Sequence, residues 1–260
     1  MSALELVDTH CHLDLPVFDG DRDAVVARAR AAGVTRILVP SIRPSTWDAT
    51  TATAAAYPDV VRIALGAHPQ IAPELDAAER AALARLPEAL EACGAIAVGE
   101  CGLDGNTPDP AAQEAVFRAQ IRAARDAKLP LVVHVYKAVD ATLRVLRDEH
   151  AGDVGGVIHS YSGPPDLVPR FSALGFAFSL AGPVTYERAR RPLEAARAIP
   201  PDLLLVETDA PDQTPVPHRG TRNEPAWVTH VAAALAAHLG EDPAALAART
   251  SANAARVFRL

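Results

Sequence analysis

The 260-residue sequence is poor in aromatic residues, cysteine and long apolar runs, and each scarcity excludes a class of protein. Aromatic residues make up 5%, so the core must be mostly aliphatic, which suits helices packed on an aliphatic sheet. The odd, irregularly spaced set Cys11, Cys93 and Cys101 argues against a disulfide framework and for a reducing cytoplasm. No apolar run is long enough to cross a bilayer, and no signal peptide is visible. We therefore expect a cytoplasmic protein with no membrane partner.

Positive charge is also scarce. Lysine and arginine number 25 against 32 acidic residues, which gives a net charge of −7. A protein that coats nucleic acid is therefore excluded, although a local cationic pocket is not. The 49% of apolar residues exclude global disorder and suffice for a large core. No low-complexity linker interrupts the chain, and no obligate protein partner is visible. We predict that residues 1–260 form a single domain, with the proline-rich stretch 211–225 as one long loop.

Apolar, β-branched segments alternate along the whole chain with longer stretches of helical period. Strands buried on both faces and separated by helices indicate a parallel sheet. Eight such units predict an α/β fold of the (β/α)8 TIM-barrel type. A doubly wound sheet is the alternative, but it requires a glycine-rich phosphate turn after the first strand, which is absent. The predicted strands are 4–10, 36–40, 62–67, 95–100, 131–134, 156–159, 176–180 and 203–207. The predicted helices are 21–32, 45–56, 76–92, 110–127, 138–149, 165–174, 187–198, 224–239, 243–248 and 251–258.

Histidines and carboxylates gather at the predicted C-terminal ends of these strands, where barrel enzymes carry their active sites. His10 and His12 lie two residues apart on the first strand, so their side chains project to the same side and that of Cys11 to the other. The pair is either half of a metal site or two buried, hydrogen-bonded histidines. What favours the metal site is that later strands end in the same way. The strand-end residues are His10, His12, Ser41, His68, Glu100, His134, His159, Glu207 and Asp209.

Four histidines and two carboxylates at one barrel mouth are too many for one tetrahedral ion. They suit two divalent ions that share a bridging carboxylate. The six predicted ligands are His10, His12, Glu100, His134, His159 and Asp209. The first two histidines and the aspartate would hold one ion, the two later histidines would hold the second, and the glutamate would bridge them. Zn²⁺, Mn²⁺, Ni²⁺, Fe²⁺ and a partly hydrated Mg²⁺ all suit such ligands.

Longer motifs surround these residues and follow one another in order along nearly the whole chain. They are Asp8-Thr9-His10-Cys11-His12-Leu13-Asp14, Gly66-Ala67-His68-Pro69, Gly99-Glu100-Cys101-Gly102-Leu103-Asp104, Gln113 with Phe117 and Gln120, Leu129-Pro130 before His134, Gly156-Val157-Ile158-His159, Glu207-Thr208-Asp209-Ala210-Pro211, Pro217-His218-Arg219-Gly220, Arg222-Asn223-Glu224-Pro225 and Thr250-Ser251-Ala252-Asn253-Ala254. Together they resemble the TatD family of metal-dependent hydrolases, in the amidohydrolase superfamily. The resemblance implies a barrel, the same six metal ligands, and phosphodiester hydrolysis in DNA, often in the 3′→5′ direction.

Three segments depart from the family pattern. Val135-Tyr136-Lys137 stands where Cys-Arg-Asp is often found, and Ser160-Tyr161-Ser162-Gly163 stands where Cys-Phe-Ser-Gly is common. Gly105-Asn106 replaces a frequent aromatic pair. All six ligand positions are retained, and the departures fall where substrate would be held. They therefore bear on the substrate and leave the metals unaffected.

Two of the predicted ligands also have predicted catalytic roles. A metal-activated water, with its pKa lowered toward neutrality, would attack phosphorus. Asp209 would take the proton of this water as general base, and Glu100 would bridge the two ions.

Four further residues are candidates for contact with substrate. Arg219 and Arg222 in the loop after the eighth strand suit phosphate oxygens, and the alternative is a salt bridge with Glu224 or Asp212. His68 would touch the substrate or hydrogen-bond a loop. Tyr161 would stack on a base or pack in the core.

Three functions are compatible with a site of this composition. The first is a TatD-like deoxyribonuclease, a 3′–5′ exonuclease with DNA as its substrate. The second is a binuclear amidohydrolase-type enzyme for a small ester, amide, lactone or phosphotriester. Some enzymes of the second kind bridge their metals with a modified lysine on the fourth strand, where this chain has Glu100 and no lysine. The third is a non-catalytic binding protein, which would be expected to have lost a ligand, and none is lost. The sequence therefore favours the nuclease.

Overall fold

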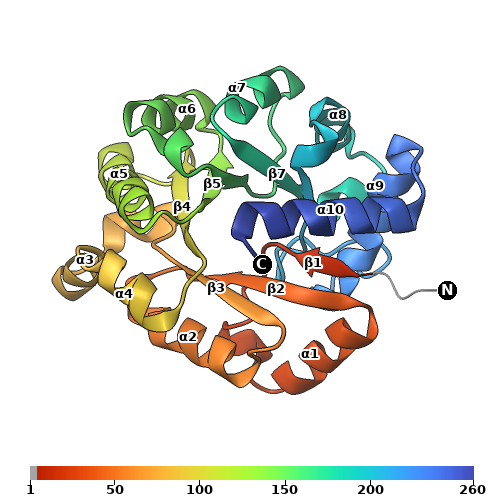
Figure 1. Ribbon diagram of the computed structural model, residues 1–260, viewed down its shortest axis with the longest axis horizontal. Helices are drawn as coiled ribbons and strands as arrows, with labels where there is room; N and C mark the ends of the chain where they lie inside the picture. Colours follow the sequence, from red (N-terminus) through yellow and green to blue (C-terminus); the bar gives the residue numbers. More distant parts are fainter. Residues whose placement is uncertain (1–4) are drawn as a thin grey trace.

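The computed structural model describes residues 5–260, and they form a barrel of parallel strands surrounded by helices (Figure 1). Each strand pairs in parallel with the next along the chain, in the order β1 to β8. The strands are β1 (Leu6–Asp8), β2 (Val34–Pro40), β3 (Val61–Leu65), β4 (Ala97–Asp104), β5 (Leu131–Tyr136), β6 (Gly156–Ile158), β7 (Phe176–Leu180) and β8 (Leu204–Val206). The predicted (β/α)8 TIM barrel is thus confirmed.

The barrel closes between its first and last strands. The backbone N–H of Thr9 donates to the carbonyl of Val206 at 3.2 Å, and that of Asp209 donates to the carbonyl of His10 at 2.9 Å. Closure therefore brings the first predicted metal ligand directly beside the last, although they are 199 positions apart in sequence.

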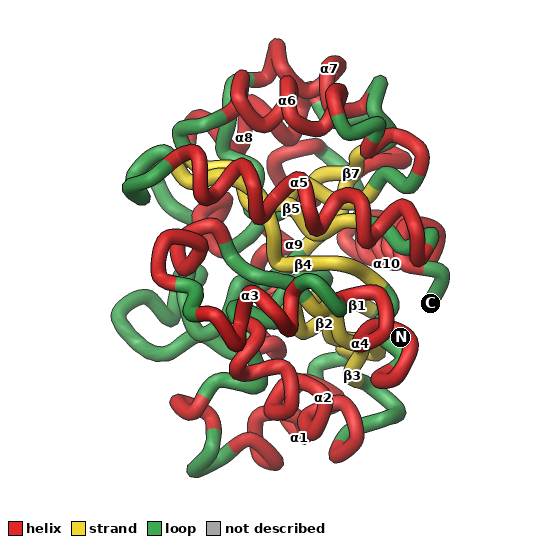
Figure 2. Tube along the Cα trace, turned by 90° about the vertical axis from the view of Figure 1, so that its left-hand side faces the viewer, coloured by secondary structure: helices red, strands yellow, loops and turns green. Residues whose placement is uncertain are grey.

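Ten α-helices lie outside the strands in residues 5–260 (Figure 2). They are α1 (Arg22–Ala31), α2 (Trp47–Ala56), α3 (Ala77–Leu83), α4 (Leu86–Cys93), α5 (Pro110–Ala127), α6 (Val139–Asp148), α7 (Val168–Ser172), α8 (Arg190–Ala198), α9 (Val228–Leu239) and α10 (Pro243–Phe258). Short 3₁₀ helices are η1 (Pro16–Phe18), η2 (Pro44–Thr46), η3 (Pro69–Glu74), η4 (Ala151–Asp153), η5 (Pro165–Leu167), η6 (Gly182–Thr185), η7 (Pro201–Leu203) and η8 (Pro225–Trp227). No helix in this part of the chain has the length and apolar character needed to cross a membrane.

Several predicted boundaries are wrong. The single helix predicted over 76–92 is two helices, because Pro87 lacks an N–H and can sit only in the first turn of a new helix, α4. The two helices predicted over 243–258 are one, α10, since neither glycine nor proline interrupts it. Strand β4 continues to Asp104, beyond the predicted end at residue 100. The predicted start of the first strand at residue 4 lies outside the described residues.

The barrel interior is filled by one small or branched residue from each strand. These residues are Val7, Leu38, Ala64, Ala97, Val132, Val157, Ala177 and Leu205, and they pack on Ala254 and Phe258 of α10. Helix α10 thus closes one end of the barrel, against β1, β6 and β8 (Figure 1). A second apolar cluster fills the space between strands and helices. The polar strand-end residues lie at the other end of the barrel, where the strands finish.

Candidate metal centre

All six predicted ligands converge at the C-terminal end of the barrel. His10 and His12 follow β1, His159 follows β6, and Asp209 follows β8, while Glu100 and His134 lie within β4 and β5. The chain brings them together because the C-terminal ends of parallel strands meet at one edge of the barrel.

An irregularity in β4 turns Glu100 toward the other ligands. The pairing of β4 with β5 shifts register between Val98 and Cys101, so the simple alternation of side chains is broken at Glu100. Gly99 permits this local path, with φ of 151° and with no room for a side chain. A Cβ atom there would lie 2.6 Å from the carbonyl oxygen of Val132. Glycine at position 99 therefore positions the predicted bridging carboxylate.

One group of donors consists of His10, His12 and Asp209. The two Nε2 atoms are 3.2 Å apart. Asp209 Oδ1 lies 3.6 Å from Nε2 of His10 and 3.8 Å from Nε2 of His12. The three atoms therefore lie close enough together to share one metal ion.

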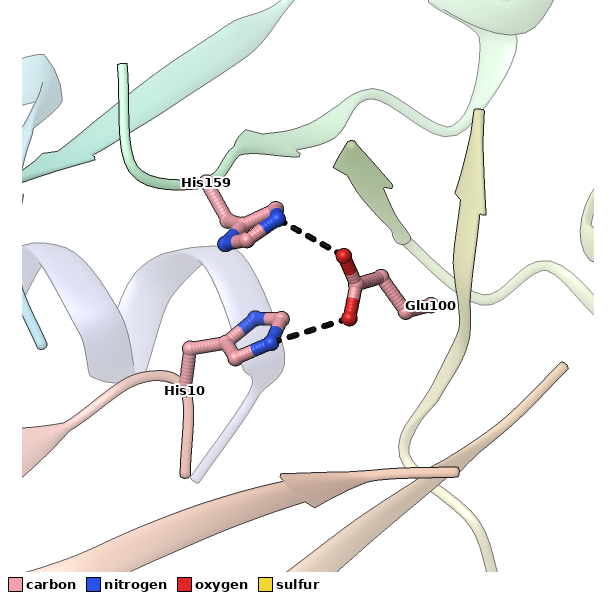
Figure 3. A group of neighbouring side chains, drawn as sticks. All are labelled: His10, Glu100 and His159. Carbon is pink, nitrogen blue, oxygen red and sulfur yellow. Dashed lines mark hydrogen bonds and ion pairs between the residues drawn. The ribbon is translucent and has the colours of Figure 1, made fainter. Parts of the chain in front are cut away.

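Glu100 faces His10 with one carboxylate oxygen and His159 with the other, and the two rings lie next to each other (Figure 3). Its Oε2 is 3.1 Å from Nε2 of His10, and its Oε1 is 2.7 Å from Nε2 of His159. Oε1 is also 3.1 Å from Nδ1 of His134. The two oxygens of one carboxylate thus face different histidines, and His10, Glu100 and His159 also lie close enough together to hold a metal ion.

His12 and His134 each make a hydrogen bond through one ring nitrogen to a residue outside the ligand set. That hydrogen bond determines which of the two ring nitrogens is left unprotonated. His12 Nδ1 lies 3.2 Å from the carbonyl oxygen of Pro40 and can only donate to it, so its Nε2 is left unprotonated. His134 Nε2 lies 3.2 Å from Oδ2 of Asp104, so its Nδ1 is free to face Glu100. Carbonyl and carboxylate partners of this kind orient metal-binding histidines in proteins. This contact of Asp104 was not predicted from the sequence, although the residue ends the motif Gly99–Asp104.

His68 also belongs to the cluster, and its contact with Glu100 was not predicted from the sequence. Its Nδ1 accepts a hydrogen bond from the backbone N–H of Gln70 at 3.2 Å. The neutral ring therefore carries its proton on Nε2, which lies 3.0 Å from Oε1 of Glu100. His68 donates to the predicted bridge and does hydrogen-bond a loop, which was one of the two alternatives.

Two buried carboxylates, those of Asp8 and Glu207, contact the segments that carry the predicted ligands. Asp8 accepts hydrogen bonds from the backbone N–H and the hydroxyl of Thr208, at 2.9 and 2.6 Å, and so joins β1 to the segment that carries Asp209. Burial raises the pKa of Asp8 to about 8. Glu207 accepts a hydrogen bond from the hydroxyl of Ser179 and lies 3.5 Å from Nδ1 of His159.

The electrostatics of the centre differ from one imidazole to the next. Burial opposes the charge of His159, yet the Glu100 carboxylate raises the pKa of that ring well above its ordinary range, whereas His10 is kept neutral. Burial lowers the pKa of His10, which keeps the ring in the form that binds metal. Burial opposes the charge of Glu100, yet the surrounding histidines hold the pKa of its carboxyl well below the ordinary range. Unprotonated imidazole nitrogens and ionised carboxylates fit the divalent ions named above.

Two of the predicted substrate-binding residues have partners within the protein. Arg222 forms a bidentate salt bridge with Asp21, at 2.8 and 2.7 Å, and not with Glu224 or Asp212. Its guanidinium also covers the ring of Phe18. Tyr161 is 3% exposed, which leaves no free ring face for a base and corresponds to the packing alternative.

Arg219 remains available to a ligand. Its guanidinium lies 4.2 Å above the ring of Tyr186, and no carboxylate in residues 5–260 forms a salt bridge with it.

Comparison with known proteins agrees with this geometry. Residues 7–259 match the family described as TatD related DNase. The chain is 35% identical to the uncharacterized metal-dependent hydrolase YabD of Bacillus subtilis, over 98% of this chain and 99% of that protein. It is 34% identical to the 3'-5' ssDNA/RNA exonuclease TatD of Erwinia billingiae, with the same coverage. The crystal structure of YjjV, a TatD homologue from Escherichia coli, superposes with a TM-score of 0.91 at 31% identity, and 99% of each chain is covered. The chain therefore belongs to the TatD-related DNase family and is a metal-dependent hydrolase.

Proposed function

We propose that this protein is a nuclease that holds two divalent metal ions and removes nucleotides from the 3′ end of DNA. The observation that carries the proposal is the position of Glu100, with one carboxylate oxygen toward His10 and the other toward His134 and His159. The activity named for the Erwinia relative supports the choice of nucleic acid as substrate.

The residues divide into two ligand groups joined by Glu100. His10, His12 and Asp209 would hold one ion, while His134 and His159 would hold the other. Bound divalent ions would lower the pKa of water toward neutrality and stabilise negative charge on phosphoryl oxygens.

The protein groups supply orientation and proton transfer. Asp209 presents Oδ1 toward the histidines, so it could accept a proton from the attacking water as general base. His68 donates to Glu100 and would keep that carboxylate ionised and in place. Arg219, in the loop after β8, provides an exposed cation that could pair with phosphate.

Metal-free protein reconstituted with Zn²⁺, Mn²⁺, Ni²⁺ or Mg²⁺ provides the test. Each form is assayed on single-stranded DNA, duplex DNA, RNA and a panel of small esters, amides and lactones. We expect release of nucleotides from the 3′ end of single strands, with up to two ions per chain by elemental analysis. His10→Ala and His134→Ala should each lose a different ion. Turnover of small esters or lactones alone, with no phosphodiester cleaved under any metal, would instead identify the amidohydrolase-type function.

A further inference from the structure

One aromatic side chain lies exposed beside the metal centre. Tyr136 is 42% exposed and is the only aromatic residue among the exposed large apolar side chains of residues 5–260. The other tyrosines are each tied to the protein, since the hydroxyls of Tyr57, Tyr161 and Tyr186 donate to Asp23, Pro164 and Thr214, respectively. No hydrogen bond to the hydroxyl of Tyr136 is present in the described part of the chain. Its ring is therefore free to meet a ligand.

The position of Tyr136 relates it directly to the candidate ligands. It is the last residue of β5, two residues after His134, so both side chains project from the same side of the strand. It pairs with Asp104 of β4, whose carboxylate contacts His134. The exposed ring thus lies closer to the mouth of the barrel than His134 does.

The positively charged side chain of Lys137 lies beside the Tyr136 ring. Lys137 is one of only two lysines in the chain, and its Nζ lies 5.2 Å from the centroid of the Tyr136 ring. It donates a hydrogen bond to the side-chain oxygen of Asn106 at 3.2 Å. No carboxylate in residues 5–260 forms a salt bridge with it, in contrast to Arg222, which Asp21 neutralises. A free positive charge therefore stands beside the ring on an otherwise acidic protein.

An exposed aromatic ring with an adjacent free cation is the combination that single-stranded nucleic acid recognises. Every base has a π-face that can stack on an aromatic side chain, and the neighbouring phosphate pairs with a cation. A small ester, amide or lactone would need neither group.

We propose that Tyr136 and Lys137 form a subsite in which a nucleobase close to the 3′ end stacks on the tyrosine ring and its phosphate pairs with the lysine. This subsite rests on the proposed function, because it assumes that a nucleic acid strand reaches the metal centre. It assigns the two residues to substrate binding, with no part in the chemical step.

Binding of a single-stranded oligonucleotide tests the stacking contact. The oligonucleotide carries 2-aminopurine at successive positions from its 3′ end, as a fluorescent reporter of stacking, and phosphorothioate linkages that resist cleavage. With metal-loaded protein, Tyr136→Ala should raise the Kd about 5- to 150-fold and abolish the quenching, whereas Tyr136→Phe should bind as the wild type does. Leu260→Ala, which removes an exposed apolar side chain elsewhere, is the control. Equal Kd values for wild type and Tyr136→Ala would overturn the proposal.

An abasic nucleotide distinguishes stacking from an indirect effect. When the base at the quenched position is removed, wild type and Tyr136→Ala should bind equally. A difference that persists without the base would reject the stacking contact. Lys137→Met should reduce the slope of log Kd against log salt by about one, and Lys137→Arg should restore it.

The failure of this subsite can be told apart from the failure of the nuclease proposal. If no phosphodiester is cleaved with any metal but oligonucleotide binding still depends on Tyr136, the subsite stands and the nuclease proposal fails. If DNA is cleaved and Tyr136→Ala has the KM of the wild type, the nuclease proposal stands and the subsite is rejected.

Discussion

The side-chain amide of Gln213 donates a hydrogen bond to Oδ2 of Asp209, which leaves Oδ1 toward His10 and His12. The oxygen and nitrogen of the Gln213 amide cannot exchange places, because the amide oxygen would then face the carboxylate oxygen of Asp209. Ser160 Oγ lies 2.7 Å from Nε2 and 2.9 Å from Oε1 of Gln213 and so holds the amide in turn. The two oxygens of Asp209 thus have separate partners.

The backbone around this contact is unusual. Ser160, Asp209 and Gln213 all have left-handed φ angles, of 45°, 56° and 51°, which non-glycine residues adopt only where the surroundings require it. Gly182 of η6 contributes to that requirement, since a Cβ atom there would overlap the carbonyl oxygen of Gln213. The backbone of the loop after β8 is therefore packed closely against η6 at Gln213.

Gln213→Leu should weaken metal binding. Without the amide, Asp209 is free to rotate, and loss of such an outer hydrogen bond typically costs about 10- to 100-fold in metal affinity or activity. Calorimetric titration of metal-free protein with Mn²⁺ or Zn²⁺ measures the change for the ion held by His10 and His12. Val216→Ala, an exposed residue of the same loop, should bind metal as the wild type does. Unchanged affinity in Gln213→Leu, with only a lower Tm, would assign the glutamine to loop stability alone.

The sequence predicted those parts of the site that follow from the repeating strand-helix unit. His10, Glu100 and His159 could be placed together without coordinates, because each stands at the end of a parallel strand and such ends meet at one edge. The same reasoning placed Asp209 beside His10, since a closed barrel must join its first and last strands.

Contacts between loops could not be predicted in this way. The partner of Arg222 is Asp21, 201 residues away in sequence, and nothing in either segment distinguishes this pairing from one with the nearer Glu224. The role of His68 depends on the backbone N–H of Gln70, whose direction is set by η3. The burial of Tyr161 depends on Phe171 and Phe178, which belong to later elements.

Phe258→Ala should destabilise the barrel without changing the metal centre. The ring is 2% exposed and packs on the inner residues of the strands, at the end opposite to the metal ligands. Removal of a buried phenylalanine side chain costs about 3–5 kcal/mol in the free energy of unfolding. Urea unfolding with chelator present measures the loss, and the metal content of the folded variant should equal that of the wild type. A loss of metal at full folding would show that α10 supports the ligands.

The Glu79–Arg43 pair should make stability depend on pH in the acid range. The Arg43 guanidinium, bonded to both carboxylate oxygens at 2.7 and 2.8 Å, lowers the pKa of Glu79 to about 2, below its ordinary value of 4.5. Because the folded pKa is depressed, this contribution is fully present above pH 4.5 and is lost as the pH falls toward 2.

Glu79→Gln should therefore lower the free energy of unfolding at pH 7 by about 1–3 kcal/mol, the cost of losing hydrogen bonds to a buried charge. The difference from wild type should shrink as the pH falls below 4.5. Urea unfolding in chelator, at intervals between pH 7 and pH 2.5, gives both quantities. Glu91→Gln, on an exposed face of α4, is the matched control. A difference that stays constant across this range would mean that the charge of Glu79 contributes nothing.

Asp209→Asn should lose activity for two reasons, weaker metal binding and loss of the general base. A second substitution at Gln213 separates the two. The amide of Gln213 would bind the one remaining oxygen of the introduced asparagine and turn the new NH₂ group toward His10 and His12, so metal occupancy should fall. In the double variant Asp209→Asn/Gln213→Leu, the asparagine oxygen can turn to the ion instead, and metal occupancy should partly recover.

If Asp209 is also the general base, kcat at full metal occupancy should stay about 10²- to 10⁴-fold below wild type, with little change in KM. Bound metal is counted at each point of a metal titration, with Asp212→Asn as the exposed neighbouring control. Near-wild-type kcat in the fully loaded double variant would leave Asp209 as a ligand only.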